Sequence, residues 1–208
     1  MTGATTAPQQ QPSSRPNWAA SLCACLLLLV LLALAAGADP VRDALRYDRQ
    51  AIAAGQWWRL LTAHLVHLGW VHALLNGMGI LLCAGLAPAV FACKKFPLLM
   101  LFLGTGIGVL MYGGYPGIGR YVGFSGVLYG LFVVGLWPQR HDALMRCALI
   151  LVLGWAGWQL LLAPLPSEEQ MIGGRIVAEA HFLGVLLAGA WLMALAGIRK
   201  TPRPHQPN

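Results

Sequence analysis

Residues 18–37 read WAASLCACLLLLVLLALAAG, an apolar stretch without one charged side chain. A helix of this length rises about 1.5 Å per residue and spans the roughly 30 Å hydrocarbon core of a bilayer. Outward from it, five more apolar runs follow along the chain, at about 70–92, 96–114, 125–137, 144–163 and 176–197. The run at 125–137 is short, so we expect its helix to begin below the membrane surface. The sequence therefore predicts an all-α, polytopic membrane protein with six transmembrane helices.

The composition points the same way. Of the 208 residues, 58% are hydrophobic and only 10% are charged, whereas soluble domains carry about a quarter charged residues. The net charge is +7, yet no basic cluster is interleaved with aromatic residues as in nucleic-acid-binding proteins. The cations lie in short connections and tails, where they orient helices and meet anionic lipid. We therefore expect the lipid bilayer as a partner and no nucleic acid.

The chain divides into three predicted parts. Residues 1–17 are rich in Thr, Gln, Pro and Ser and predict a disordered N-terminal arm. Residues 18–198 form the membrane domain and residues 199–208 a basic C-terminal tail. One alternative concerns the first apolar run, because Ala36-Gly37-Ala38 before an aspartate resembles a signal-peptidase site. The run is longer than a usual signal core, which favours a retained helix.

Lys and Arg residues alternate between the connections on the two sides of the predicted bundle. With both termini cytoplasmic, eight of these residues lie inside and six outside, and all three Lys are inside. Positive residues favour the cytoplasmic side of a membrane, so we expect both termini in the cytoplasm.

Four polar side chains stand out in the apolar runs, namely His72, Asn76, Ser125 and His181. Such residues are costly in a membrane, so each is a candidate for a function. Ser125 lies in Gly123-Phe124-Ser125-Gly126, at the predicted start of a helix. Flanking glycines allow close backbone approach, and a helix start offers free N–H groups that stabilise an oxyanion. The alternative is a serine in a glycine-rich packing seam.

His181 is the single histidine of the last run and is the candidate general base for a serine hydroxyl. Gly184 lies one turn further on the same face, and Tyr129 shares the face of Ser125, where it can brace the imidazole ring. A structural histidine is the alternative. Because no carboxylate lies in the interior of a run, a Ser–His mechanism here would use a dyad and not a triad.

His72 and Asn76 are spaced i, i+4, so both side chains project from one face of the second helix. A pair of hydrogen-bond donors on one face suits an oxyanion hole. Polar packing between two helices is the alternative interpretation of this pair.

Together these residues resemble the rhomboid family of intramembrane serine proteases. The resemblance runs from Gly55 to Gly189, and its motifs occur in the family's order: Trp58-Arg59, His67-x-x-x-x-His72-x-x-x-Asn76, Gly123-x-Ser125-Gly126-x-x-Tyr129 and Ala180-His181-x-x-Gly184. It implies a six-transmembrane-helix, rhomboid-like bundle with a membrane-embedded first loop. It also implies transmembrane proteins as substrates and an active site near the outer leaflet.

The resemblance further implies a role for each matching residue. Ser125 would be the nucleophile and His181 the base, and the oxyanion hole would comprise His72, Asn76 and the Ser125 N–H. The remaining matches are supporting residues: Tyr129 on the imidazole, Trp58 and Arg59 in the first loop, and Gly123, Gly126 and Gly184 at close contacts. His67 is similar to a loop-packing histidine and has no chemical role.

Within the family, the minimal core and the run GQWWRLLTAH at residues 55–64 resemble the bacterial rhombosortase branch. Members of this branch are associated with substrates that end in a glycine-rich motif, a membrane helix and a basic tail. This likeness implies a bacterial inner membrane location.

Other functions receive less support from the sequence. A catalytically silent rhomboid-like protein that binds transmembrane helices would usually lack the serine or the histidine. A small transporter would carry charged residues within its spans or paired repeats. His64, His67 and His72 lack a His-Glu-x-x-His motif, so we expect no metal and no cofactor. The sequence carries no signal for the oligomeric state.

Overall fold

A computed structural model of the protein describes residues 18–92 and 94–200. The predicted N-terminal arm, residues 1–17, lies outside the described residues, as does the tail beyond residue 200. The described chain is mainly helical, and each of the six predicted apolar runs contains a helix. These helices are α1 (Trp18–Ala36), α5 (Trp70–Leu86), α7 (Phe96–Gly114), α8 (Ser125–Leu136), α9 (Ala143–Leu162) and α11 (Ala178–Lys200).

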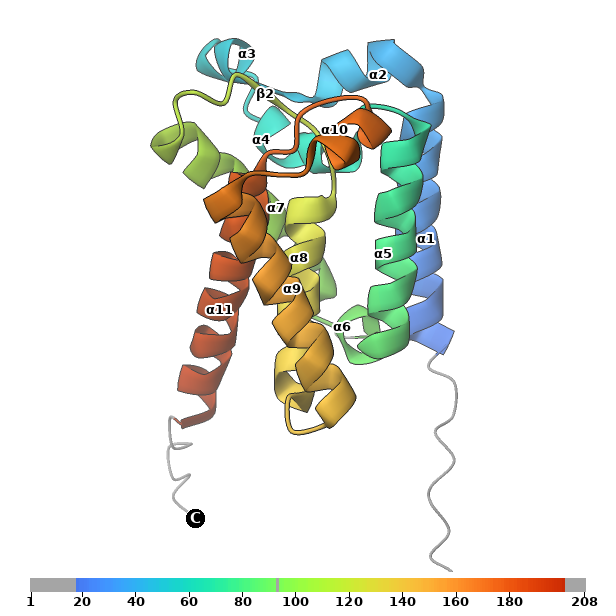
Figure 1. The fold of residues 1–208 in the computed structure, drawn as a ribbon, viewed down its shortest axis with the longest axis vertical. Helices are drawn as coiled ribbons and strands as arrows, with labels where there is room; N and C mark the ends of the chain where they lie inside the picture. The colour runs from blue at the N-terminus through green and yellow to red at the C-terminus, as the bar shows by residue number, and fades with distance from the viewer. Residues whose placement is uncertain (1–17, 93, 201–208) are drawn as a thin grey trace, which may run out of the picture.

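Shorter elements occupy the connections. They are α2 (Ala38–Leu45), β1 (Tyr47–Asp48), α3 (Arg49–Ala53), α4 (Arg59–Thr62), the 3₁₀ helix η1 (Ala63–Leu65), α6 (Pro88–Ala92), β2 (Arg120–Tyr121), the 3₁₀ helix η2 (Trp137–Gln139) and α10 (Pro166–Ile172). Figure 1 shows α2, α3, α4, α10 and β2 gathered at one end of the bundle, with the long helices below them. The opposite end carries α6 and the connection between α8 and α9.

Four helices are long and apolar enough to cross a membrane: α1, α7, α9 and α11. A fifth span is possible where α4 and η1 join α5 across an 87° bend. The predicted number was six, and the difference lies in length, since α5 has 17 residues and α8 only 12. The described part of the chain therefore gives four or five candidate spans.

Helix α8 lies at the centre of the bundle and packs against α5, α7, α9 and α11 (Figure 1). Eight of its twelve residues are buried, and the side chains it buries on all sides are small or aliphatic. The outer helices instead leave large apolar side chains exposed, such as Leu161 on α9 at 80%. In a lipid solvent such side chains need no protein partner, so they form the outer surface of the bundle.

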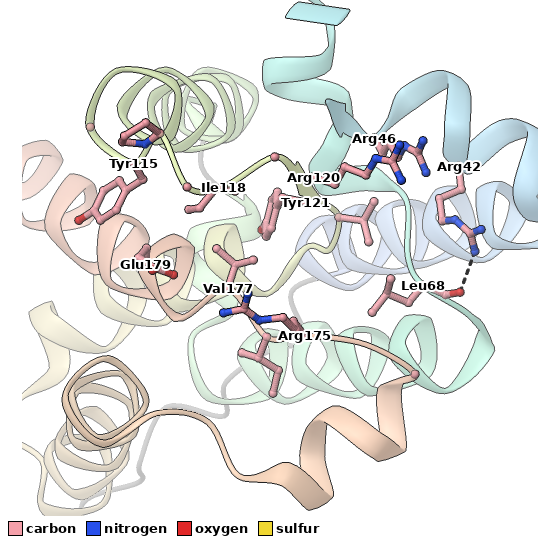
Figure 2. A pocket seen from close by; sticks show the side chains of 17 residues that line it. Arg42, Arg46, Leu68, Tyr115, Ile118, Arg120, Tyr121, Arg175, Val177 and Glu179 are labelled. Carbon is pink, nitrogen blue, oxygen red and sulfur yellow. Dashed lines mark hydrogen bonds between the residues drawn. The ribbon is translucent and has the colours of Figure 1, made fainter. Parts of the chain in front are cut away.

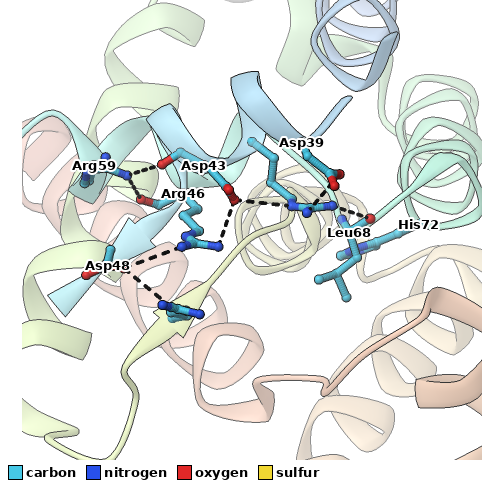
Figure 3. Close-up of polar contacts among 9 residues, drawn as sticks. Asp39, Asp43, Arg46, Asp48, Arg59, Leu68 and His72 are labelled. Atoms are coloured by element: carbon cyan, nitrogen blue, oxygen red, sulfur yellow. Dashed lines mark hydrogen bonds and ion pairs between the residues drawn. The ribbon is translucent and has the colours of Figure 1, made fainter. Parts of the chain in front are cut away.

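Polar contacts hold the first loop, residues 37–69, over one end of the bundle (Figure 3). Arg59 is buried and donates to the carbonyl oxygens of Asp43, at 2.8 Å, and Arg46, at 2.9 Å. The Trp58 side chain beside it is exposed. Strand β1 of this loop pairs antiparallel with β2, with Tyr47 opposite Tyr121. This pairing ties the first loop to the segment that leads into α8.

Candidate active site

The turn before Ser125 has a shape that only glycine at position 123 permits. Gly123 has a φ of +124°, and a Cβ there would lie 2.7 Å from the His72 ring. Its N–H donates to the Ala63 carbonyl at 3.0 Å. Positive φ costs free energy for other residues, so this glycine fixes how the chain enters α8.

A buried tyrosine holds the other end of the same turn. The Tyr121 hydroxyl donates to the Gly123 carbonyl at 2.7 Å and lies 3.3 Å from His64 Nδ1. The other ring nitrogen of His64 lies 2.9 Å from the Gly104 carbonyl oxygen on α7. Burial raises the pKa of the Tyr121 hydroxyl above its ordinary value, so the group stays a neutral donor. The turn is thus linked to α7 as well as to the first loop.

Helices α8 and α11 approach until their backbones touch. A Cβ on Gly184 would collide with the carbonyl oxygen of Gly126, and one on Gly126 would lie 2.8 Å from the Ala180 carbonyl oxygen. The two helices can lie this close only because both positions carry glycine. Gly126 directly follows Ser125 on α8, and Gly184 lies one turn after His181 on α11.

The close contact brings the serine and the histidine together. Ser125 Oγ lies 2.7 Å from His181 Nε2, which is a short hydrogen bond. The histidine is 6% exposed. The ring of Tyr129 stacks on the imidazole, with centroids 4.6 Å apart and planes inclined by 24°. A serine and a histidine in this arrangement can perform nucleophilic catalysis.

A further polar residue, which the sequence analysis did not single out, contacts the histidine. Gln159 Oε1 on α9 lies 2.7 Å from His181 Nδ1, and Gln159 Nε2 donates to Glu168 Oε2 at 3.2 Å. The available signal was an amide between Trp158 and Leu160 in an apolar run, since strongly polar residues in such runs call for an explanation.

His72 and Asn76 are both buried on α5. Asn76 Nδ2 donates to the His72 carbonyl oxygen at 3.0 Å, and its second amide hydrogen can serve another acceptor. His72 Nδ1 accepts weakly from the Leu68 N–H at 3.5 Å. In a neutral ring this leaves the proton on Nε2, the nitrogen that lies near Gly123.

These side chains line one cavity of about 330 Å³, shared by Ser125, His181, His72, Asn76, Tyr129, Gln159 and Glu168. A larger cavity of about 800 Å³ adjoins it at the end of the bundle that carries the first loop. Figure 2 shows this larger cavity, with Tyr121, Arg175 and Val177 among its lining residues. All three also line the smaller cavity. The shared lining offers water a route from the larger cavity toward the partly buried Ser125.

The two loop residues implied by the resemblance lie outside this cavity. Arg59 supports the first loop from within, and Trp58 is exposed on that loop. Among the described residues, no three His, Cys, Asp or Glu side chains are grouped so that they could hold a metal ion.

A third cavity, of about 380 Å³, lies between α5, α8 and α9 on the side of the bundle. Its lining is almost entirely apolar and comes from α5, α8 and α9, including Leu86, Phe132 and Leu151. Trp155 and Tyr129 line both this cavity and the one that contains Ser125. An apolar segment in this third cavity would thus lie next to the polar site.

Comparisons with known proteins show the family of the chain. Residues 54–199 match the rhomboid domain family. The chain is 29% identical over 168 residues to the putative rhomboid protease YdcA of Bacillus subtilis (strain 168), covering 79% of each protein. It is also 28% identical over 176 residues to the rhomboid protease GluP of the same organism, covering 80% of this chain but 34% of that relative.

Proposed function

This chain belongs to the rhomboid family and is a serine intramembrane protease, and from that premise we propose that Ser125 and His181 are its catalytic dyad. The observation that carries the proposal is the 2.7 Å hydrogen bond between Ser125 Oγ and His181 Nε2, two residues that line the same cavity. Ser125 would attack the carbonyl carbon of a peptide bond while its proton passes to His181. The histidine then returns this proton to the leaving amine, and water hydrolyses the acyl-enzyme.

The oxyanion of the tetrahedral intermediate needs donors fixed in advance. Ser125 is the first residue of α8, where backbone N–H groups lack intrahelical acceptors and the helix dipole is positive. His72 and Asn76 line the same cavity and each can present an N–H. We assign the oxyanion hole to these two side chains and the Ser125 N–H, with Tyr129 holding the imidazole ring in place.

The substrates would be transmembrane proteins that reach the site from the lipid. The apolar cavity between α5, α8 and α9 supports this route, because it adjoins the serine cavity through Trp155 and Tyr129. The GQWWRLLTAH run favours the rhombosortase branch, and with it substrates that end in a glycine-rich motif, a membrane helix and a basic tail.

We place six spans in the membrane by counting α5 and α8 together with α1, α7, α9 and α11. Helix α1 packs against α5 and α6, which supports its retention in the mature protein. The distribution of Lys and Arg favours cytoplasmic termini. The first loop and the serine cavity would then face the outer leaflet of a bacterial inner membrane.

The test is co-expression with a tagged substrate that carries a glycine-rich motif, an apolar helix and a basic tail. We expect cleavage by the wild type and none by Ser125→Ala or His181→Ala. Ser21→Ala and His141→Ala are matched controls, since both residues are exposed and line neither polar cavity. Membrane accumulation of every variant is checked first.

A fluorophosphonate probe tests the serine without a substrate, because it reacts with an activated serine hydroxyl. Labelling of the wild type that is lost in Ser125→Ala would support the dyad. Equal labelling and cleavage in Ser125→Ala would overturn it. A wild type that is labelled but leaves the tagged substrate intact would reject the proposed substrate class alone.

A further inference from the structure

The proposed mechanism assigns no role to Gln159, the polar side chain on the far side of the histidine. This residue lies on α9 and is only 4% exposed. Its Oε1 lies 2.7 Å from His181 Nδ1, the ring nitrogen that does not face Ser125. A role for this contact in catalysis rests on the proposed dyad.

The contact determines which ring nitrogen carries the proton. A neutral imidazole has one N–H, and an amide oxygen can only accept a hydrogen bond. Gln159 Oε1 therefore requires the proton on Nδ1 of His181, which leaves Nε2 as the acceptor. Ser125 Oγ–H then donates to Nε2, as a serine must when the histidine acts as its base.

The opposite orientation of the Gln159 amide would have the opposite effect. Its NH₂ group would donate to Nδ1, and the ring proton would move to Nε2, where it blocks proton transfer from Ser125. Glu168 on α10 selects between the two orientations, because its Oε2 lies 3.2 Å from Gln159 Nε2. A carboxylate only accepts, so reversing the amide would bring two acceptor oxygens into contact.

We propose that Gln159 is a positioning residue that sets the tautomer and ring plane of His181, and that Glu168 fixes the orientation of its amide. The chain of contacts is Ser125, His181, Gln159, Glu168. In serine proteases with a triad a carboxylate touches the histidine directly, whereas here a neutral amide stands between them. Helix α10 thereby takes part in the site through two successive hydrogen bonds.

The first test separates orientation from packing. Gln159→Met keeps the length of the side chain but cannot accept from Nδ1, and we expect kcat to fall about 10- to 100-fold with KM within about twofold. In the double variant Gln159→Glu with Glu168→Gln, the carboxylate at position 159 accepts from His181 Nδ1–H, and the amide at position 168 donates to that carboxylate. This variant should therefore keep most of the kcat that Gln159→Met loses. A packing role predicts little loss in the methionine variant and no rescue by the double variant.

The second test reverses the amide without touching the histidine. The ammonium group that Glu168→Lys introduces can only donate, so it should turn the Gln159 oxygen toward itself and the NH₂ toward His181. We expect a loss of kcat at least as large as that of Gln159→Met, and no further loss when both changes are combined. Ser167→Lys adds a positive charge to α10 at an exposed neighbour and should leave kcat within about twofold. Additive effects in the double variant would overturn the proposal.

A third measurement needs no catalysis. In Ser125→Ala protein labelled with ¹⁵N-histidine, the His181 signals are assigned by their loss in His181→Gln. The proposal expects the Nδ1–H tautomer, and a shift toward Nε2–H when Gln159 is replaced by methionine. An Nε2–H tautomer in the protein that keeps Gln159 would overturn it. An Nδ1–H signal together with a wild type that neither cleaves nor reacts with the probe would reject the dyad and leave the positioning contact standing.

Discussion

Helix α8 meets its neighbours in two different ways. Toward α11 the backbones touch at Gly126 and Gly184, and no space remains for a methyl group. Toward α5 and α9 the same helix borders an apolar cavity of about 380 Å³ lined by leucine and aromatic side chains. The tight side holds Ser125 and His181 at hydrogen-bonding distance, and the open side leaves room for an apolar guest. Catalysis requires that the reacting atoms are held in place, and substrate entry requires empty space. Helix α8 meets the first need on the face toward α11 and the second on the faces toward α5 and α9.

The largest effect is expected where the tight side is broken. Gly184→Ala places a methyl group against the Gly126 carbonyl oxygen, so the two backbones must separate. We expect a loss of about 3 kcal/mol in the free energy of unfolding and at least a hundredfold loss of cleavage, measured in detergent and in membranes. Gly189→Ala on the same helix meets open space and serves as the control. Equal behaviour of the two variants would contradict the tight contact.

A smaller loss is expected at the turn that leads into the tight side. Gly123→Ala puts a methyl group against the His72 ring at a residue whose φ is +124°. In the same segment, the methyl group of Gly119→Ala meets open space. We expect a cost of about 1–3 kcal/mol in stability and about a tenfold loss of fluorophosphonate labelling for position 123 only. Labelling retained in Gly123→Ala would show that the turn does not position Ser125.

Changes on the open side are expected to raise activity instead of lowering it. Trp155 lies between the apolar cavity and the serine cavity, so Trp155→Val widens the passage. We expect cleavage of a transmembrane substrate to rise about three- to tenfold, while labelling by the small probe stays within about twofold. Trp158→Val is the control, because Trp158 lies on α9 but lines neither cavity. A fall in cleavage for Trp155→Val alone would assign the tryptophan a supporting role.

The smallest effect on stability is expected in the first loop, where the polar contacts are between charged groups. The Ser125–His181 hydrogen bond between α8 and α11 joins neutral groups instead. Partial burial would raise the pKa of Asp48, but the N–H of Ala51 and the charge of Arg46 outweigh it and hold this pKa below its ordinary range. A carboxyl whose pKa is lowered by folding stabilises the fold above its ordinary pKa, and this contribution is lost as the pH falls through the folded value.

Asp48→Asn should therefore have a slightly lower Tm than the wild type at pH 6. The difference should shrink as the pH falls below the ordinary carboxyl pKa of about 4 and toward the lower pKa of folded Asp48. Thermal unfolding in detergent between pH 3 and 6 measures it. A difference that stays constant over this range would mean that Asp48 acts through its shape and not through its charge.

Much of the fold and the site could be predicted from the sequence because a membrane makes polar residues conspicuous. The six apolar runs all contain helices, and four polar side chains within them stood out from the sequence: Ser125, His181, His72 and Asn76. The structure brings all four to one cavity. Gln159 was missed because an amide near the end of an apolar run resembles an interfacial residue until its partner is known.

The sequence by itself determined that the chain lies in a lipid bilayer, where its helices are, and which residue types can do chemistry. These properties follow from local composition and spacing. Only the tertiary structure decided which faces of α8 are tight and which are open, and that Gln159 and Glu168 reach the far side of His181. Hydropathy carries little information on how a helix is rotated in lipid, because leucine is equally apolar against lipid and against another helix. The rotation is settled by the close glycine contacts and by the few hydrogen bonds that buried polar groups must make.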